Sequence, residues 1–86
     1  MKSVAVLTGA SRGIGSAIAE ELASSYAVIV LAARDRAGLE ETGRQVRTAN
    51  GTPILVQADV RTEEGRNALI AAAEAAGDIE LLVNNA

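Results

Sequence analysis

The chain has 86 residues and a formal net charge of −3, and it contains neither cysteine nor histidine. Disulfide bridges, zinc sites built from cysteine or histidine, and histidine acid–base chemistry are therefore excluded within these residues. The acidic balance, without a basic run, argues against general binding to nucleic acid or to an anionic membrane. Hydrophobic residues make up 49% and aromatic residues 1%. We expect one small domain, residues 1–86, with a core of aliphatic side chains.

The sequence also argues against export and membrane insertion. The apolar run at residues 4–7 stops at Thr8-Gly9, which is too short for the hydrophobic region of a secretion signal. No stretch approaches the roughly 18 apolar residues of a membrane span. We therefore expect a soluble, cytoplasmic protein.

A glycine-rich turn at residues 8–15, Thr-Gly-Ala-Ser-Arg-Gly-Ile-Gly, follows the first apolar run. It leads into a predicted helix in which Ile14, Ile18 and Leu22 recur at helical spacing on the expected buried face. A strand, a glycine turn and a helix together place backbone N–H groups and the positive end of the helix dipole against a phosphate. The turn therefore predicts a phosphate-binding site.

The rest of the chain alternates between predicted strands and helices. The continuous apolar run at residues 27–33 is typical of a parallel strand that is covered on both faces. Residues 54–58 and 79–83 are predicted to form the third and fourth strands. Asp35 is predicted to cap a second helix that ends at Asn50-Gly51, before Pro53. Thr62 is predicted to cap a third helix that ends at Gly77. The buried faces of these helices are predicted to contain Leu39, Thr42, Val46 and Ala49, and then Leu69, Ala72, Ala73 and Ala76.

This β-α-β-α-β-α-β pattern predicts a Rossmann-type three-layer α/β fold with a parallel sheet and right-handed crossovers. With the glycine turn after the first strand, the expected strand order is 3-2-1-4. A ligand should then bind at the carboxyl ends of strands 1 and 4.

The end of the second predicted strand indicates which dinucleotide is bound. NAD-binding units usually place an acidic residue there for the ribose 2′-hydroxyl, whereas this chain has Ala33 followed by Arg34. Arg12 lies inside the glycine turn, so two guanidinium groups are expected to bind a 2′-phosphate. The alternatives are that Arg34 is a solvated charge, or that Asp35 serves as the ribose-binding acid rather than as a helix cap.

Asp59-Val60 follows the third predicted strand. The carboxylate could accept a hydrogen bond from an adenine amino group while the valine packs on the ring. Without the glycine turn, Asp59 would be read as an ordinary turn residue.

Together these residues resemble the short-chain dehydrogenase/reductase family over the entire chain. The family's Thr-Gly-x-x-x-Gly-x-Gly motif is matched by Thr8, Gly9, Gly13 and Gly15. The basic residues found in NADP-preferring members of the family are matched by Arg12 and Arg34. The family's Asp-Val pair is matched by Asp59-Val60, and its Asn-Asn-Ala motif by residues 84–86.

The resemblance implies a cofactor-binding role for a defined set of residues. Gly9 to Gly15 would hold the pyrophosphate and adenosine ribose, Asp59 and Val60 the adenine, and Asn84 to Ala86 the nicotinamide-side ribose. Thr8 and Asn85 are expected to tie strands together as well. The full set of predicted cofactor-binding residues is Gly9, Ser11, Arg12, Gly13, Ile14, Gly15, Arg34, Asp59, Val60, Asn84, Asn85 and Ala86.

The family's catalytic serine and Tyr-x-x-x-Lys motif have no counterpart here, because Tyr26 and Lys2 lack that spacing. The resemblance therefore implies the NADP(H)-binding portion of an oxidoreductase, with no catalytic residue of its own. The fourth predicted strand would form an exposed apolar edge. We expect the chain to be a fragment of a longer reductase, or to pair with itself or a complementary chain.

Two other functions are compatible with parts of the sequence. A binding-only module that senses NADP would need the same turn and no catalytic residues. A methyltransferase-like half-domain also has a glycine loop after its first strand, but normally has an acid where Thr8 stands. A P-loop nucleotidase is excluded because Ile14-Gly15-Ser16 replaces the Lys-Ser/Thr of that motif.

Overall fold

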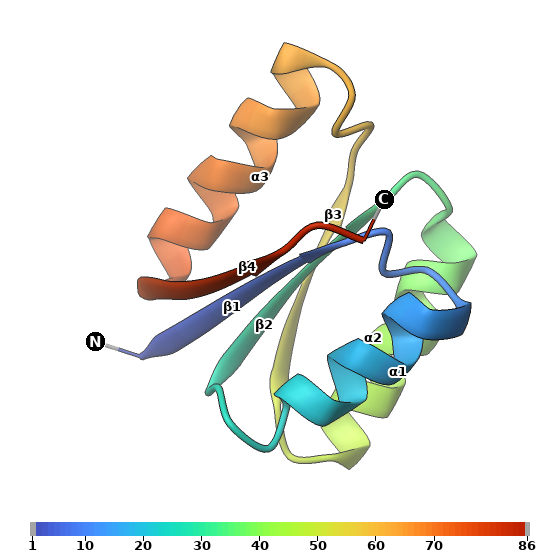
Figure 1. The fold of residues 1–86 in the computed structure, drawn as a ribbon, viewed down its shortest axis with the longest axis vertical. Helices are drawn as coiled ribbons and strands as arrows, with labels where there is room; N and C mark the ends of the chain where they lie inside the picture. Colours follow the sequence, from blue (N-terminus) through green and yellow to red (C-terminus); the bar gives the residue numbers. More distant parts are fainter. Residues whose placement is uncertain (1, 86) are drawn as a thin grey trace.

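The computed structural model describes residues 2–85. Within them, strands and helices alternate along the chain, as the sequence predicts (Figure 1). The elements in order are β1 (Ser3–Thr8), α1 (Gly13–Leu22), β2 (Val28–Ala33), α2 (Arg36–Thr48), β3 (Thr52–Gln57), α3 (Glu63–Ala76) and β4 (Asp78–Val83).

The described strands form one parallel sheet in the order β3-β2-β1-β4. The predicted Rossmann-type fold and strand order are therefore confirmed. The winding reverses between β1 and β4, and their carboxyl ends lie at the same edge of the sheet (Figure 1). In sheets of this type, ligands bind outside that edge.

Helices cover both faces of the sheet, with α1 and α2 on one side and α3 on the other (Figure 1). Alternate residues of β1 and β2 supply the two cores, because successive side chains in a strand point to opposite faces. Buried residues on the first side are Ala5, Leu7, Ala10, Ala19, Ala23, Ile29, Leu31, Leu39 and Val46. Those on the second are Val4, Val6, Val28, Val30, Ala32, Leu69 and Ala73. Both cores are aliphatic, as predicted.

One core prediction is wrong. Ile14 was expected on the buried face of α1, but 74% of it is exposed. The helix instead turns Gly15 and Ala19 fully inward, and Ile14 lies about 100° around the helix from its neighbour Gly15. The position that faces the sheet is therefore occupied by a glycine, which allows the close packing described below.

The third strand begins earlier than predicted and includes Pro53, which pairs with Ile29 of β2. Among the described residues β3 is an edge strand, and an edge tolerates proline because one side of the strand needs no ladder hydrogen bond. Pro53 therefore lies within β3 and does not move the start of the strand to a later residue.

Three of the predicted helix ends have different outcomes, while α3 ends at Gly77 as predicted. Thr62 caps α3 as predicted, with its side chain accepting from the backbone N–H of Gly65 at 2.9 Å. Asp35 occupies the N-cap position of α2, but within the described residues its carboxylate makes no capping hydrogen bond. At the end of α2, Asn50 takes the left-handed conformation, with φ of 71°. The next N–H, of Gly51, then bonds to the Val46 carbonyl at 2.9 Å.

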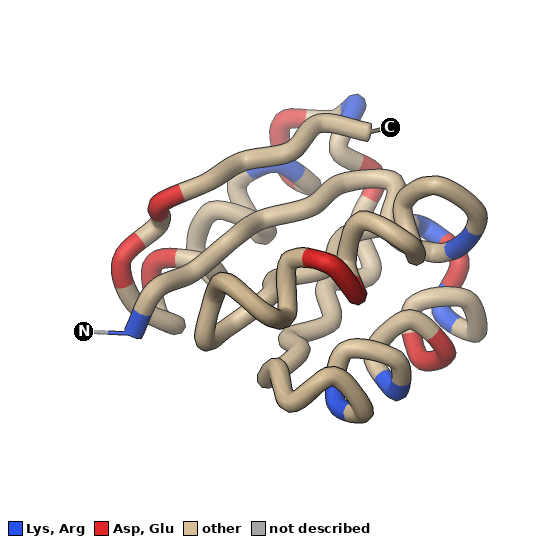
Figure 2. Tube along the Cα trace, turned by 60° about the horizontal axis from the view of Figure 1, so that its bottom comes forward, with Lys and Arg blue, Asp and Glu red and all other residues tan. Residues whose placement is uncertain are grey.

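Charged residues of both signs are distributed over the helices and turns (Figure 2).

The fourth strand differs from its neighbours in its exposure. Within residues 2–85, β4 has a neighbouring strand on one side only, namely β1. Ile79 is 41% and Leu82 58% exposed on it, and Ile70 of the adjacent α3 is 43% exposed. The fold therefore presents an apolar strand edge to solvent.

Candidate functional site

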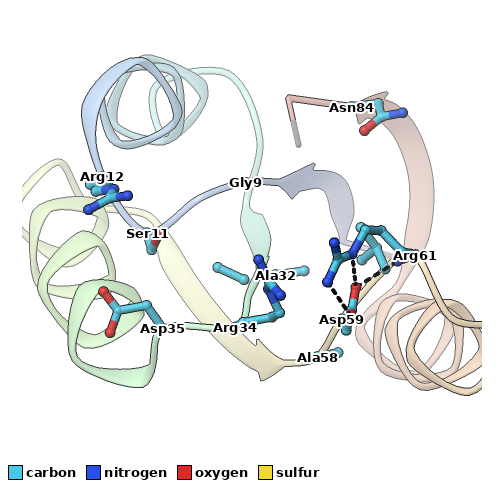
Figure 3. A pocket seen from close by; sticks show the side chains of 12 residues that line it. Gly9, Ser11, Arg12, Ala32, Arg34, Asp35, Ala58, Asp59, Arg61 and Asn84 are labelled. Carbon is cyan, nitrogen blue, oxygen red and sulfur yellow. Dashed lines mark hydrogen bonds and ion pairs between the residues drawn. The ribbon is translucent and has the colours of Figure 1, made fainter.

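A cavity of about 750 Å³ opens at the carboxyl edge of the sheet. Each strand contributes to it through the loop that follows, so residues far apart in the sequence meet there (Figure 3). The lining residues are Gly9, Ser11, Arg12, Ala32, Ala33, Arg34, Asp35, Ala58, Asp59, Val60, Arg61 and Asn84. This volume is in the range of small-molecule and cofactor sites.

The glycine turn forms one wall of the cavity. Gly9 and Gly13 both have positive φ, at 64° and 61°, which residues with a side chain rarely adopt. An added Cβ at Gly13 would meet nothing within 4 Å, so the space beside this backbone is open. Arg12 is the N-cap of α1, and among the described residues no side chain caps this helix end. The first N–H groups of α1 thus lack side-chain acceptors at the positive end of the helix dipole.

Gly15 lies against the turn from within the helix. A Cβ on this residue would overlap the backbone carbonyl of Gly9 and would come within 2.8 Å of Nδ2 of Asn85. The Asn85 Nδ2 group itself donates to the Gly9 carbonyl at 3.1 Å. Residues from the turn, the helix and the end of β4 are therefore packed in direct contact.

Thr8 links the same turn to the end of β4. Its hydroxyl donates to Oδ1 of Asn84 at 2.9 Å and accepts from the backbone N–H of Asn85 at 3.0 Å. Thr8 is only 5% exposed. Thr8 and Asn85 thus tie β1 to β4, as the sequence led us to expect, while Asn84 lines the cavity.

Both predicted cationic residues line the cavity, and they come from different loops. Arg12 comes from the turn after β1, and Arg34 from the loop after β2 (Figure 3). The Arg34 loop is tied to β3, because the Gln57 side chain donates to the Arg34 carbonyl at 3.1 Å. The site thus offers guanidinium groups near a helix N-terminus, which is an arrangement suited to phosphate groups.

Asp35 also lines the cavity, on the side of Ser11 and Arg12 (Figure 3). A Cβ on Gly38 would come within 2.5 Å of the Ser11 carbonyl oxygen and 2.8 Å of Asp35 Oδ2. Gly38 therefore lets the start of α2 approach the glycine turn. The carboxylate stays within the cavity wall instead of bonding to its own helix.

The opposite wall contains an ion pair that the sequence reasoning missed. Both oxygens of Asp59 accept hydrogen bonds from the Arg61 guanidinium at 3.0 Å, and Oδ1 also accepts from the Arg61 backbone N–H at 3.0 Å (Figure 3). These hydrogen bonds, first from the side chain and then from the backbone, lower the pKa of Asp59 from 3.8 to about 2. Asp59 therefore remains an ionised acceptor. The sequence signal that could have indicated this ion pair is an arginine two residues after an aspartate at the end of a strand.

The predicted cofactor residues fall into three groups in the structure. Gly9, Ser11, Arg12, Arg34, Asp59, Val60 and Asn84 line the cavity. Gly13, Ile14, Gly15 and Asn85 belong to the turn, the start of α1 or the end of β4 that surround it. Ala86, the last residue of the predicted set, lies outside the described residues. The roles given to these positions remain predictions.

Comparison with known proteins identifies the family. The sequence pattern of the short chain dehydrogenase family matches residues 3–86. The chain therefore belongs to the short-chain dehydrogenase/reductase family.

Among curated relatives, the ketoacyl reductase HetN of Nostoc sp. is 42% identical over 82 residues, which cover 94% of this chain and 29% of HetN. Glucose 1-dehydrogenase 2 of Bacillus subtilis is 40% identical over 83 residues, which cover 94% of this chain and 32% of that enzyme. The chain thus spans about a third of the length of the curated relatives it matches.

Solved structures show the same fold. A metagenomic short-chain oxidoreductase in complex with NADP is 42% identical, with a TM-score of 0.88 over 98% of this chain and 38% of its own. Carveol dehydrogenase from Mycobacterium avium in complex with NAD is 28% identical, with a TM-score of 0.87 over 98% of this chain and 35% of its own. The two related structures hold different dinucleotides.

No helix within residues 2–85 combines the length and the apolar character that a membrane span requires.

Proposed function

We propose that this chain binds NADP(H) at the cavity beside the glycine turn, as the cofactor-binding domain, residues 1–86, of an oxidoreductase that acts on carbonyl or alcohol substrates. The observation that carries the proposal is one cavity lined by both Arg34 and Arg12, the N-cap residue of the uncapped helix α1. A helix N-terminus with flanking guanidinium groups suits a pyrophosphate and a further phosphate. The residues present therefore fit the cofactor that the family uses.

Each part of the cavity has a proposed role. The backbone of Gly9 to Gly15, with Ser11 and Ile14 included, holds the pyrophosphate and the adenosine ribose. Arg12 and Arg34 bind the 2′-phosphate. Asp59 and Val60 contact the adenine, and the segment 84–86 lies along the nicotinamide-side ribose. When bound, the cofactor supplies the hydride chemistry, while the groups of this chain bind and orient it.

The 86 residues contain no counterpart of the family's Tyr-x-x-x-Lys motif. We therefore propose that these residues position the cofactor and that catalytic proton transfer requires groups other than these. A module that binds NADP without turning it over is the second candidate function, because it would need only the same cofactor cavity. The two are separated by replacing the corresponding first third of a full-length family reductase with this chain and assaying oxidation of NADPH by that reductase's carbonyl substrate. Turnover by the hybrid favours the first function.

NAD(H) is the competing cofactor. The carboxylate of Asp35 lines the cavity without a capping bond to its helix, so it could accept from a ribose 2′-hydroxyl. The two guanidinium groups of Arg12 and Arg34 outweigh the single carboxylate of Asp35, so the net positive charge favours a 2′-phosphate. The proposed preference for NADP(H) therefore depends on the net charge of these three side chains.

Titration of the chain with NADPH and with NADH tests the cofactor preference. We expect tighter binding of NADPH, and loss of that preference in Arg34→Asp. A charge-assisted Arg–phosphate bond contributes about 1.5–3 kcal/mol, or roughly 10- to 150-fold in affinity. Arg36→Asp, on the outer face of α2 where its partner is Glu40, controls for the change in net charge. Equal binding of both cofactors by the unmodified chain would contradict the role given to Arg34.

The partner proposed for the β4 edge is a second copy of this chain. Within residues 2–85 one edge of β4 is unpaired and offers backbone donors and acceptors, and the exposed Leu82 of β4 and Ile70 of α3 add apolar surface there. Edges of this kind recruit further strands. The proposed location is the cytoplasm, which the lack of cysteine supports.

A further inference from the structure

The turn after β3 holds Asp59 by its side chain and by its backbone. Arg61 engages both carboxylate oxygens with its guanidinium at 3.0 Å. The carbonyl of Asp59 accepts from the Thr62 hydroxyl at 2.9 Å and from the Thr62 N–H at 3.1 Å. Gly65 packs so closely on this carbonyl that a Cβ there would overlap it. Asp59 is therefore fixed in the cavity wall.

The following backbone is fixed as well. The guanidinium of Arg66 donates to the carbonyls of Val60 and Arg61, at 3.1 and 3.0 Å. Val60 thus has a restrained position beside the carboxylate, and both residues line the cavity. An apolar side chain next to an oriented carboxylate is a platform for a flat ring that carries a hydrogen-bond donor.

The hydrogen bonds leave the two carboxylate oxygens unequally occupied. Oδ1 of Asp59 accepts from both the backbone N–H and Nε of Arg61, whereas Oδ2 accepts only from Nη2. An ionised carboxylate is an acceptor with about four lone-pair sites, so Oδ2 keeps capacity for one more donor. The Arg61 fork sets the direction in which that capacity points.

We propose that Arg61 is the positioning residue for recognition of the purine base, because it orients Asp59 to accept from the exocyclic amino group of adenine. This inference rests on the proposed dinucleotide function. Hypoxanthine presents a carbonyl oxygen where adenine has the amino group, and that oxygen would face the Asp59 carboxylate without a donor between them. The pair Asp59–Arg61 therefore discriminates between these bases.

The test compares two forms of one cofactor, NADPH and its hypoxanthine analogue, by equilibrium titration. Their ratio of dissociation constants reports base recognition alone, because any loss of positive charge near the phosphates weakens both forms equally. We expect the unmodified chain to favour the adenine form by about tenfold or more, the effect of one hydrogen bond to a charged group. Arg61→Ala should lower that ratio toward one.

Two further variants complete the design. Arg61→Lys keeps the positive charge but lacks the two-pronged guanidinium. Compared with Arg61→Ala, it should recover more of the affinity for both cofactor forms than of the ratio between their dissociation constants. Arg44→Ala removes an exposed arginine that pairs with Glu41 on α2, and it should leave the ratio unchanged. Melting temperatures of all variants identify any loss of folding, and the lysine variant serves if the alanine variant is unfolded.

Each outcome of the titrations supports or contradicts the positioning role of Arg61. An unchanged ratio in Arg61→Ala and Arg61→Lys would overturn the inference, since Asp59 would then be oriented without the fork. A higher ratio in Arg61→Ala would also overturn it, because Arg61 would then compete with the base for the carboxylate. An unmodified chain that binds NADPH without preference for adenine contradicts the inference alone. Failure to bind NADPH at all contradicts the proposed function and the inference with it.

Discussion

Gly15 of α1 touches the backbone carbonyl of Gly9 so closely that a β-carbon on Gly15 would overlap it. This contact sets the distance between the start of the helix and the turn that follows β1. The same contact holds in place the start of α1, which follows directly after the cavity-lining residue Arg12. The requirement for glycine here comes from helix-to-turn packing, whereas at Gly13 it comes from the positive φ.

Gly15→Ala should therefore destabilise the fold by about 1–3 kcal/mol, the usual cost of inserting a methyl group into a close-packed site. Urea denaturation followed by circular dichroism measures the change. Ala17→Ser, at an exposed position of the same helix, should change stability by no more than about 0.5 kcal/mol. Equal stability of Gly15→Ala and the unmodified chain would show that the turn can move away from the helix.

The bond between Thr8 and the end of β4 leads to a second prediction. Thr8→Val keeps the shape but leaves Oδ1 of Asn84 and the N–H of Asn85 without this partner, in a region where Thr8 is buried. A loss of about 1–3 kcal/mol is expected. Hydrogen exchange at the Asn85 amide should also become faster.

The matched control is Ser24→Ala, which removes an exposed hydroxyl that bonds to the Glu21 carbonyl. Its stability should stay close to that of the unmodified chain. If Thr8→Val were as stable as Ser24→Ala, and exchange at Asn85 were unaltered, the tie between β1 and β4 would contribute nothing.

The sequence was sufficient to predict the fold because the strands and helices differ so clearly in pattern. The continuous apolar run at residues 27–33 predicted the buried strand β2, and Thr62 marked the start of α3. Ile14 was misassigned because helical spacing alone does not reveal which residue faces the sheet. That assignment depends on how closely Gly15 approaches Gly9, which is a tertiary contact.

The predicted site residues were found mainly where a strand ends, since parallel strands bring their carboxyl ends together. Arg61 was missed because its importance comes from a side-chain bond to Asp59, not from its place in a motif. For Asp35, the sequence predicted the position of the residue but not the hydrogen bonding of its side chain. Its position at the start of α2 was predicted correctly, but within residues 2–85 its carboxylate makes no capping hydrogen bond to the helix.

The Asp59–Arg61 pair predicts a pH dependence of stability. Hydrogen bonds from Arg61 lower the pKa of Asp59 from 3.8 to about 2, so the ionised carboxylate stabilises the folded state. This contribution is fully present above the unfolded pKa, near pH 4, and is lost as the pH falls through about 2. The stability difference between the unmodified chain and Arg61→Ala should therefore narrow across this range.

Urea denaturation at intervals from pH 5 to pH 2 measures that difference. In an Asp59→Asn background the effect of Arg61→Ala should be independent of pH, because no carboxylate remains to titrate at that position. A difference between the two proteins that stayed constant from pH 5 to pH 2 would contradict the assignment.

The open edge of β4 predicts concentration-dependent association. Leu82 is 58% exposed on this strand, and Leu82→Lys should shift the chain toward the monomer, because a charged side chain on an edge opposes strand pairing. Light scattering over a concentration series measures the shift. Ile14→Lys, at an exposed position on α1, is the control and should leave association unaltered. A sharp monomer peak for the unmodified chain at every concentration would contradict the proposed self-association.

The central claim, that a dinucleotide occupies the cavity beside the glycine turn, is tested most directly by NMR titration of the ¹⁵N-labelled chain with NADPH. We expect saturable shifts concentrated on the amides of Gly9 to Gly15, Arg34 and Asp59 to Arg61. Amides on the outer face of α2, such as Arg44, should shift little. The absence of saturable shifts, or shifts centred away from these loops, would contradict the account.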